Sequence, residues 1–262
     1  MNSIVEINLV QFSIVYVLLL IVLGIMKKGK INQSKLLIIA SMRMTVQLIL
    51  AGLLLTYIFK NPNPIFTVLY VVAMAVFSIH RALSRNSELG EWFKGPIVIS
   101  LAGTGTFILF FFIVVVVGVD FLNPQYTIPI GGMVFGNAMT GVTLGLKTFH
   151  ESLKSDRNRI QTLINLGVPP RRILSPISNN ALETALMPTL NSMLGMGIIS
   201  LPGMMTGQIL SGTLPMTAIL YQIAIMISIC TAVCLATFCS LSLGSKKLYN
   251  KRNQIIFYDR EN

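Results

Sequence analysis

The side chain with the most demanding chemistry is Arg43, because it lies inside an apolar run at residues 36–59. A guanidinium within a membrane span costs about 2.5–3.5 kcal/mol on insertion scales, so it should face protein or water. Gln47 follows one helical turn later and would share its face. Arg43 is therefore a candidate for a polar path through a membrane or for pairing between helices. The alternative is that its side chain simply extends to the nearer membrane interface.

Two further apolar runs, at residues 127–147 and 181–201, are interrupted by Gly or Pro and carry isolated polar side chains. Broken helices of this kind mark the substrate path in many transporters. The candidates for lining such a path are Arg43, Gln47, Asn137, Thr140, Glu183, Asn191, Met204, Met205 and Gln208. Glu183 can instead form a helix cap together with Asn180.

The sulfur-containing residues do not form a recognisable metal site. Four of the 14 methionines surround Pro202, namely Met193, Met196, Met204 and Met205. Thioethers can bind soft metals such as Cu(I), but no His or Cys lies near, and adaptable apolar packing explains these methionines better. The three cysteines, Cys230, Cys234 and Cys239, share one apolar run and match no zinc or redox spacing. We therefore expect no metal site in this chain.

Two partial motifs for enzyme chemistry are incomplete. The segment 24–30 has the glycine and lysine spacing of a phosphate-binding loop, but Ile31 occupies the position where Ser or Thr would contact magnesium. His150 and Glu151 begin like a zinc-protease helix, but Lys154 replaces the second histidine. We therefore expect no catalytic residue, no bound cofactor and no ATPase activity of its own.

The composition places the chain in a membrane. Of its 262 residues 53% are hydrophobic and only 11% are charged, whereas soluble domains carry about 25% charged residues. The net charge of +11 would suggest nucleic acid as the partner of a soluble protein, but here the basic residues fall between apolar runs. We expect an all-α, multi-pass protein of the cell membrane, a single domain over 1–262. Its seven predicted spans are 7–26, 36–59, 64–80, 97–119, 127–147, 181–201 and 215–243.

The basic residues also predict an orientation. The chain has 20 Lys and Arg. Four lie in the loop after the first run, three in the loop after the third, six in the loop after the fifth and five in the tail. Only Lys60 lies in another loop, and Arg43 lies within a run. By the positive-inside rule the N-terminus is then outside and the C-terminus is in the cytoplasm. An odd number of spans agrees with termini on opposite sides.

The longest hydrophilic interval, residues 147–180, has the punctuation of an ordered segment. Its apolar residues between 153 and 164 follow helical spacing. Gly167 occupies the position of a left-handed C-terminal cap, and Pro169-Pro170 prevents continuation. The spacing predicts a helix over 151–166 and a short turn over 170–174 that Pro176 ends. The next span then begins at a capping pair, Asn180 and Glu183.

Several segments resemble one known family. The motifs are GMVFGNAM at 132–139, ALMPTLNS at 185–192, GIISLPGMMTGQILSG at 197–212, Pro215, and YQI at 221–223. They are similar to those of the FetB-type permeases, bacterial membrane subunits of ABC transporters associated with iron export. Plant aluminium-tolerance half-transporters are similar to the same family. The resemblance covers nearly the whole chain and is densest over 130–225.

The resemblance implies a permease that forms a homodimer and binds a separate cytosolic ABC ATPase, on which ATP and magnesium would bind. The cytoplasmic coupling segment would lie within about 148–180, and the residues matching the coupling helix are Ile160, Gln161, Leu163, Ile164, Leu166 and Gly167. The implied substrate is iron or another metal, although the plant relatives have been tied to a nucleotide sugar. A stand-alone channel, an ion-coupled carrier and a non-transporting membrane scaffold are the alternatives. Channels and carriers usually place carboxylates or histidines inside their spans.

Overall fold

The computed structural model describes residues 8–61 and 63–249, and within these ranges all regular secondary structure is helical. The helices are α1 Leu9–Lys28, α2 Ser34–Lys60, α3 Pro64–Arg85, α4 Lys94–Phe110, α5 Pro124–Ser155, α6 Arg157–Asn165, α7 Pro170–Gly195, α8 Gly203–Leu210 and α9 Pro215–Ser245. A π-helical stretch, Phe111–Val117, prolongs α4 and ends at Gly118, whose φ of +75° suits glycine. The all-α class is confirmed.

Each of the seven apolar runs predicted from the sequence contributes to a helix. Five segments of the described chain are long and apolar enough to cross a membrane, namely Val10–Lys28, Ser34–Lys60, Pro64–Arg85, Glu91–Val117 and Pro215–Ser245. The helices α5 and α7 are equally long but more polar, because α5 contains Gly, Asn and Thr and α7 begins with a basic, Ser-rich half. The seven-span count and the orientation of the termini stay predictions.

The chain packs as two compact units, and the smaller one is built on α1 and α2, with Leu210–Gly212 assigned to it. A hydrogen bond joins the Tyr16 and Thr45 hydroxyl groups of the two helices. Only Ser41 and Ile58 are buried in α2. The other apolar side chains of α1 and α2 are largely exposed, as they would be on helices that contact lipid.

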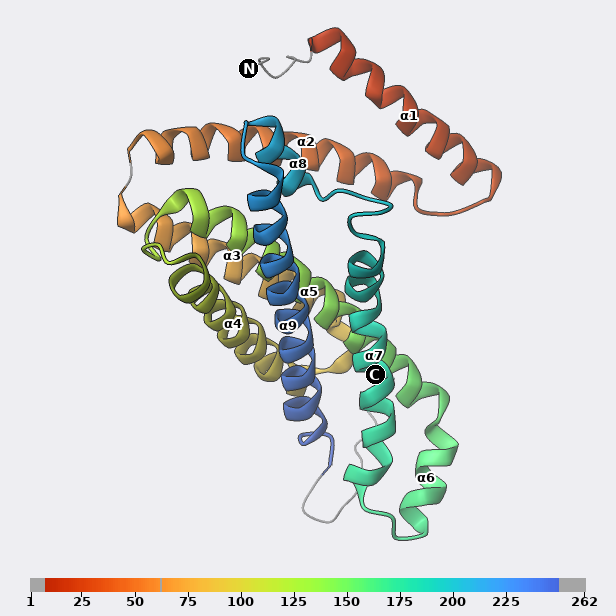
Figure 1. Ribbon diagram of the computed structural model, residues 1–262. Coiled ribbons are helices and arrows are strands. Elements are labelled where there is room, and N and C mark those ends of the chain that lie inside the picture. The colour runs from red at the N-terminus through yellow and green to blue at the C-terminus, as the bar shows by residue number, and fades with distance from the viewer. Residues whose placement is uncertain (1–7, 62, 250–262) are drawn as a thin grey trace. The chain divides into compact units, whose positions relative to one another are not determined.

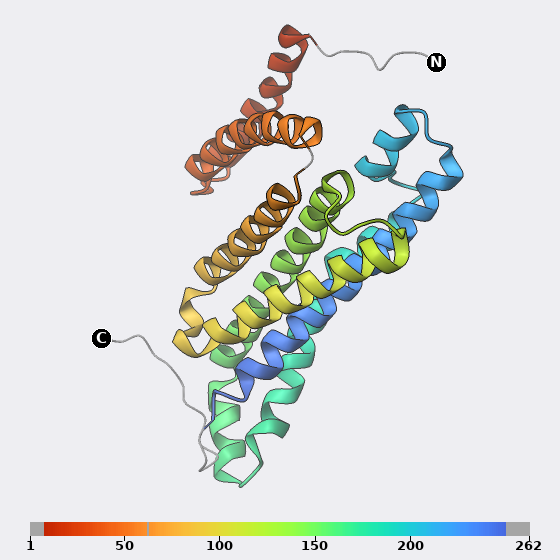
Figure 2. The same ribbon diagram turned by 90° about the vertical axis from the view of Figure 1, so that its left-hand side faces the viewer.

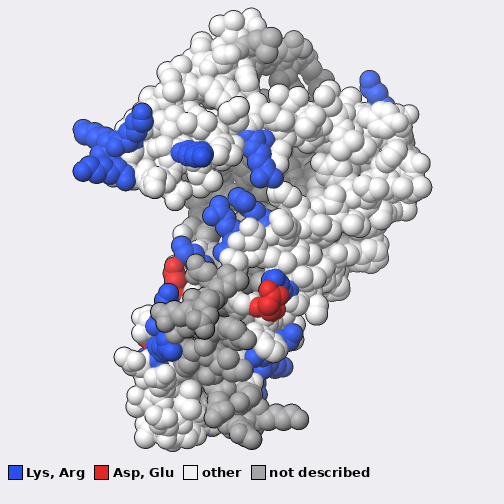
Figure 3. All heavy atoms as spheres, turned by 180° about the vertical axis from the view of Figure 1, so that it is seen from behind, with Lys and Arg blue, Asp and Glu red and all other residues white. Residues whose placement is uncertain are grey.

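The larger unit is a bundle of α3, α4, α5, α7 and α9, with α6 at one end. Figures 1 and 2 show α5 running through the middle of this bundle, and α5 packs on each of the other four helices. The core is continuous along α5 and includes Phe135, Val142, Leu146 and Phe149, all with 1% exposure or less. Figure 3 shows wide uncharged areas of surface, and within the bundle the charged residues gather in the half that carries α6.

Two glycines allow α5 to approach its neighbours closely. A Cβ atom built on Gly141 would lie 2.5 Å from Val233 Cγ1 of α9. One built on Gly145 would lie 2.8 Å from Thr237 Cγ2 and 3.2 Å from the backbone oxygen of Ala181 in α7. Small residues at such positions let membrane helices pack backbone to backbone. Gly141 and Gly145 therefore let α5 pack closely on α7 and α9.

The first glycine pair of α5 behaves differently. A Cβ on Gly132 would meet only Met74 Cε at 3.6 Å, and one on Gly136 would meet nothing within 4 Å. Gly132 thus touches only Met74 of α3, and Gly136 makes no close contact with another helix of the bundle.

The two helices that flank the hydrophilic interval were predicted to end at 147 and to begin at 181, and both boundaries were wrong. The fifth run continues as helix to Ser155, and α7 begins at Pro170 and passes without interruption through Pro176 and Pro188. A proline removes one backbone hydrogen bond, but α7 buries Ile173, Leu174 and Ile177 in the core, and this packing outweighs the local loss.

The predicted capping pair is also wrong. Asn180 and Glu183 lie in the interior of α7, where both side chains are exposed. Their sequence pattern is that of a helix start, but the helix already extends through them from Pro170.

The two kinds of glycine in α5 give a matched stability test. Gly145→Ala should lower the free energy of unfolding by about 1–3 kcal/mol, because its Cβ meets the backbone of α7 and Thr237 of α9. Gly136→Ala is the control, and it should leave stability unchanged or raise it by up to about 1 kcal/mol through helix propensity. Thermal unfolding of the purified chain in detergent would measure both. Equal destabilisation by the two variants would contradict the packing described for α5.

Candidate functional site

A pocket of about 320 Å³ opens between α5, α7 and α9, and the connection from α7 to α8 closes one side of it. We call it the α5–α7–α9 pocket. Its lining consists of Met133, Asn137, Thr140, Gly141, Leu144, Ala185, Pro188, Thr189, Ser192, Met196, Pro202, Gly203, Met204, Gln222, Met226 and Ile229. Its volume lies at the lower end of the range typical of small-molecule sites.

The glycine-rich sequence of α5 explains why this pocket exists. Gly141 brings α9 close on one side, while Asn137 and Thr140 lie on the neighbouring exposed side of the same helix. On the far side the chain leaves α7 after Gly195 and turns at Gly197, whose φ is +84°. The backbone amide of Gly197 donates to the Ser200 carbonyl at 2.9 Å, which closes this turn before Pro202 starts the approach to α8.

No charged side chain lines the pocket, and its polar groups are amides and hydroxyls. The Thr140 hydroxyl donates to the Gly136 carbonyl at 2.9 Å, and the Asn137 amide donates to the Met133 carbonyl at 2.8 Å. These bonds use the Thr140 hydroxyl hydrogen and one of the two Asn137 amide hydrogens within α5. The acceptor lone pairs of both side chains can therefore receive hydrogen bonds from a ligand.

Thioether groups also line the pocket, and they belong to Met133, Met196, Met204 and Met226. The side-chain amide of Gln222 donates to the Met196 sulfur at 3.8 Å. Met side chains adapt to ligands of different shape. Among the described residues no group of three or more His, Cys, Asp or Glu is placed to hold a metal ion. The pocket thus offers neutral oxygen and sulfur atoms to a ligand.

The structure brings together three of the residues predicted for a path, Asn137, Thr140 and Met204. Met205 is buried at 8% exposure and does not line the pocket, and Gln208 lies further along α8. Glu183 and Asn191 are exposed on α7 outside the lining. Arg43 and Gln47 are exposed on α2, in the smaller unit.

The sequence analysis missed Thr189, Ser192 and Gln222. A usable signal existed for Gln222, because it is an amide within the apolar run 215–243 and such residues tend to face protein or a water-filled cavity. Gln222 is 7% exposed and lies opposite α7 in the pocket.

The second candidate site is the segment that joins α5 to α7 at the end of the bundle, with α6 at its centre. The structure ends α5 at Ser155 and starts α6 after Asp156, so the predicted helix over 151–166 is two helices. The Gly167 amide donates to the Ile164 carbonyl at 2.9 Å and the Val168 amide to the Leu163 carbonyl at 3.0 Å. With a φ of +80° at Gly167 this is a Schellman motif. The predicted left-handed glycine cap is confirmed.

The residues predicted for the coupling helix differ in their exposure to solvent. Ile160 is 1% exposed, and Leu163 and Ile164 are partly buried against the core of the bundle. Leu163 and Ile164 thus pack on the bundle with part of their surface, and the coupling role of Ile160, Leu163 and Ile164 stays a prediction. Gln161 is exposed, and Leu166 is 74% exposed beside Gly167. Leu166 is the apolar side chain of this turn that a partner could cover.

Comparison with known proteins gives a consistent group of relatives. The model of the uncharacterised protein family UPF0014 matches residues 9–249. The chain is 30% identical over 251 residues to the probable iron export permease protein FetB of Escherichia coli, covering 95% of this chain and 96% of that protein. It is 29% identical over 249 residues to the UPF0014 membrane protein YjkA of Bacillus subtilis, covering 94% and 97%.

A plant protein belongs to the same group of relatives. The chain is 32% identical over 216 residues to Protein ALUMINUM SENSITIVE 3 of Arabidopsis thaliana, covering 81% of this chain and 77% of that protein. No solved structure matches the chain.

The exposure of the pocket can be tested by thiol labelling. In a variant whose cysteines Cys230, Cys234 and Cys239 are replaced by Ala, Thr140→Cys should react readily with a small maleimide, because Thr140 is exposed to the pocket. Ala138→Cys is the matched control, since Ala138 is 0% exposed on the opposite side of α5. Mass spectrometry of the purified protein would measure both rates. Comparable labelling of the two positions would contradict the exposure of Thr140 and the burial of Ala138 in this structure.

Proposed function

This chain belongs to the UPF0014 family, and from that premise we propose that it is the membrane-spanning permease subunit of an ABC transporter. It is a multi-pass protein of the cell membrane. We propose that ATP hydrolysis on a separate cytosolic ATPase drives transport and that ATP and magnesium bind on that partner. The permease itself would act as a homodimer and would have no enzymatic activity.

The observation that carries this proposal is that the α5–α7–α9 pocket and the segment around α6 are built on the same two helices. α6 connects the end of α5 to the start of α7, while Asn137 and Thr189 line the pocket further along these helices. From Thr140 to Ser155 the continuous helix rises about 22 Å. A force applied at α6 would thus reach the pocket through rigid elements, as required for a switch between two packings.

A stand-alone channel or an ion-coupled carrier would have no use for this arrangement. Neither needs an ordered helix and a glycine turn with an exposed leucine outside the membrane. In addition, the α5–α7–α9 pocket contains no carboxylate or histidine that could couple transport to a proton or cation. These two features favour the ATP-driven mechanism.

The substrate that the family resemblance favours is iron or another metal, exported from the cell, because FetB is named a probable iron export permease. The pocket also favours a second candidate, an organic molecule such as a nucleotide sugar. A volume of about 320 Å³ with a neutral lining exceeds what a bare cation needs, and iron normally binds carboxylate or imidazole ligands. A metal substrate would therefore pass this pocket as a complex or with its water shell.

The proposed topology has seven spans, an outside N-terminus and a cytoplasmic C-terminus. Single cysteines at Asn61 and Asn123 should react with a membrane-impermeant reagent in intact cells. Cysteines at Arg85, Arg157 and Tyr249 should react only after lysis, because the positive-inside rule places them in the cytoplasm. Labelling of Arg157→Cys in intact cells would reverse the orientation.

The coupling role is tested by Leu166→Asp in a complex with the ATPase that co-purifies with the chain. Leu166 is 74% exposed, so the charge should leave the bundle folded and disrupt docking. We expect ATP hydrolysis to lose its stimulation by substrate. Gly167→Val should act similarly, because a β-branched residue at a φ of +80° costs about 1–2 kcal/mol.

Ile31→Asp is the control for Leu166→Asp, since Ile31 is an exposed apolar residue in the loop between α1 and α2. It should retain stimulated hydrolysis. Normal transport by both Leu166→Asp and Gly167→Val, or the absence of any co-purifying ATPase from the wild-type protein, would refute the proposal.

A further inference from the structure

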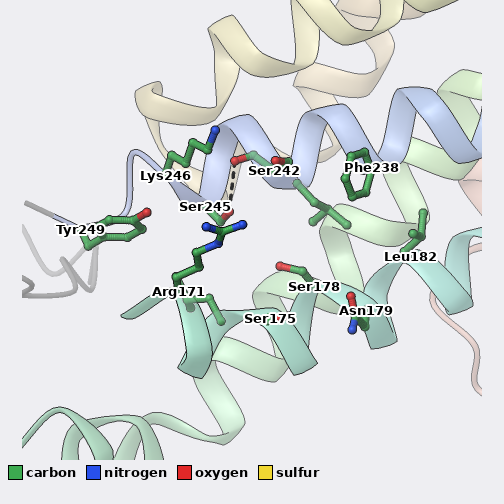
Figure 4. Close-up of a pocket in the computed structure, with 12 residues that line it drawn as sticks. Arg171, Ser175, Ser178, Asn179, Leu182, Phe238, Ser242, Ser245, Lys246 and Tyr249 are labelled. Carbon is green, nitrogen blue, oxygen red and sulfur yellow. Dashed lines mark hydrogen bonds between the residues drawn. The ribbon is translucent and has the colours of Figure 1, made fainter. Parts of the chain in front are cut away.

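A second cavity of the bundle lies between the first half of α7 and the last half of α9, and the proposed path does not use it. Its volume is about 310 Å³, and Figure 4 shows the side chains that line it. We call it the α7–α9 groove. It shares no lining residue with the α5–α7–α9 pocket. A ligand of the α7–α9 groove would therefore be separate from a ligand of the α5–α7–α9 pocket.

The polarity of the groove changes along its length. Arg171, Lys246 and Tyr249 lie toward one end, and Leu182 and Phe238 lie at the other. From Arg171 to Leu182 the α7 helix rises about 16 Å. A groove with a cationic end and an apolar end is complementary to an anionic amphiphile.

Hydroxyl groups occupy the middle of the groove. Ser178 lies on the α7 side and Ser242 and Ser245 on the α9 side. The Ser245 hydroxyl donates to the Ser242 carbonyl at 3.3 Å, so its oxygen remains able to accept a hydrogen bond. Serine hydroxyls at this height can donate hydrogen bonds to the ester oxygens of a lipid, which only accept them, either directly or through water.

Among residues 8–61 and 63–249, no acidic side chain pairs with the cations at the polar end. Across the residues that the structure describes, neither Arg171 nor Lys246 forms an ion pair, and no acidic residue lines the groove. Arg171 also lies in the first turn of α7, which contains no acidic residue. The positive end of a helix dipole favours anions and disfavours cations. A bound anion would remove this mismatch.

The groove also lies at the end of a candidate membrane span. The candidate span Pro215–Ser245 ends beside Ser245, and Lys246 follows directly. Phe238 lies two turns inside this span and is 54% exposed. The apolar end of the groove therefore lies along the candidate span, and the polar end lies where this span ends.

We propose that the α7–α9 groove binds an anionic phospholipid. Arg171 and Lys246 receive the phosphate of the headgroup, the serine hydroxyls contact the glycerol region, and Leu182 and Phe238 contact an acyl chain. Basic pockets between membrane helices bind anionic headgroups in this way. The inference is independent of the proposed ABC mechanism, since it requires only that α9 crosses the membrane.

The test uses the full chain in detergent, titrated with phosphatidylglycerol and analysed by native mass spectrometry. Phosphatidylcholine serves as the zwitterionic comparison. The wild-type chain should bind phosphatidylglycerol more tightly. The double variant R171Q/K246Q should bind phosphatidylglycerol about 30-fold more weakly, from about 1 kcal/mol for each cation near the membrane surface.

The matched control is R172Q/K247Q, which removes the same charge from the neighbouring residues. Neither Arg172 nor Lys247 lines the groove, and both are exposed. This control should keep the wild-type affinity. An equal loss in both double variants would overturn the proposal, because it would indicate attraction by diffuse surface charge.

Two further measurements separate a lipid from a soluble phosphate. Inorganic phosphate in excess should not displace phosphatidylglycerol, and Phe238→Ser should weaken phosphatidylglycerol binding while all four cations remain. Displacement by inorganic phosphate, or unchanged lipid binding by Phe238→Ser, would overturn the assignment of a phospholipid. Equal thermal unfolding midpoints of the variants would show that each effect arises in the groove.

Discussion

The structure of the bundle depends on the close approach of α5 to α7 and α9 at Gly141 and Gly145. Inside a membrane, apolar side chains gain little by leaving lipid for protein, so helices associate through tight packing and interhelical polar contacts. At Gly145 the backbone oxygen of Ala181 would lie only 3.2 Å from an added Cβ, which leaves no room for a side chain. These contacts set how closely α7 and α9 approach α5.

The same packing sorts the residues of α5 by face. The side toward α9 and α4 carries Phe135 and Val142, which are fully buried, whereas the side with Asn137 and Thr140 remains open. An open polar face on a central helix has to meet water, ligand or another chain, because lipid cannot satisfy it. The position of the α5–α7–α9 pocket is thus a consequence of packing on the opposite side of α5.

The sequence predicted most of the fold because apolar runs and basic loops are strong signals in membrane proteins. It also predicted the turn at Gly167, because glycine readily adopts the positive φ of a left-handed cap and Pro169-Pro170 prevents the helix from continuing. It failed where tertiary packing overrides local preference, as in α7, which stays helical through Pro176 and Pro188.

The sequence predicted Asn137, Thr140 and Met204 as residues of the site, but it could not group them with Gln222 and Ser192. That grouping depends on which faces of three helices meet, and local periodicity does not encode this. The inward side of Leu163 was missed for the same reason.

The prolines of α7 have a further consequence for the two cavities. Pro188 lines the α5–α7–α9 pocket, and Pro176 follows Ser175, which lines the α7–α9 groove. Each proline leaves one carbonyl of the preceding turn without its helical partner, so the helix bends more easily there than elsewhere. Between the two prolines α7 is held by Ala181 and Ala185 against Gly145 of α5. A change of bend at either proline would therefore pivot about this contact. One helix therefore lines both cavities, and its closest contact with α5 lies between them.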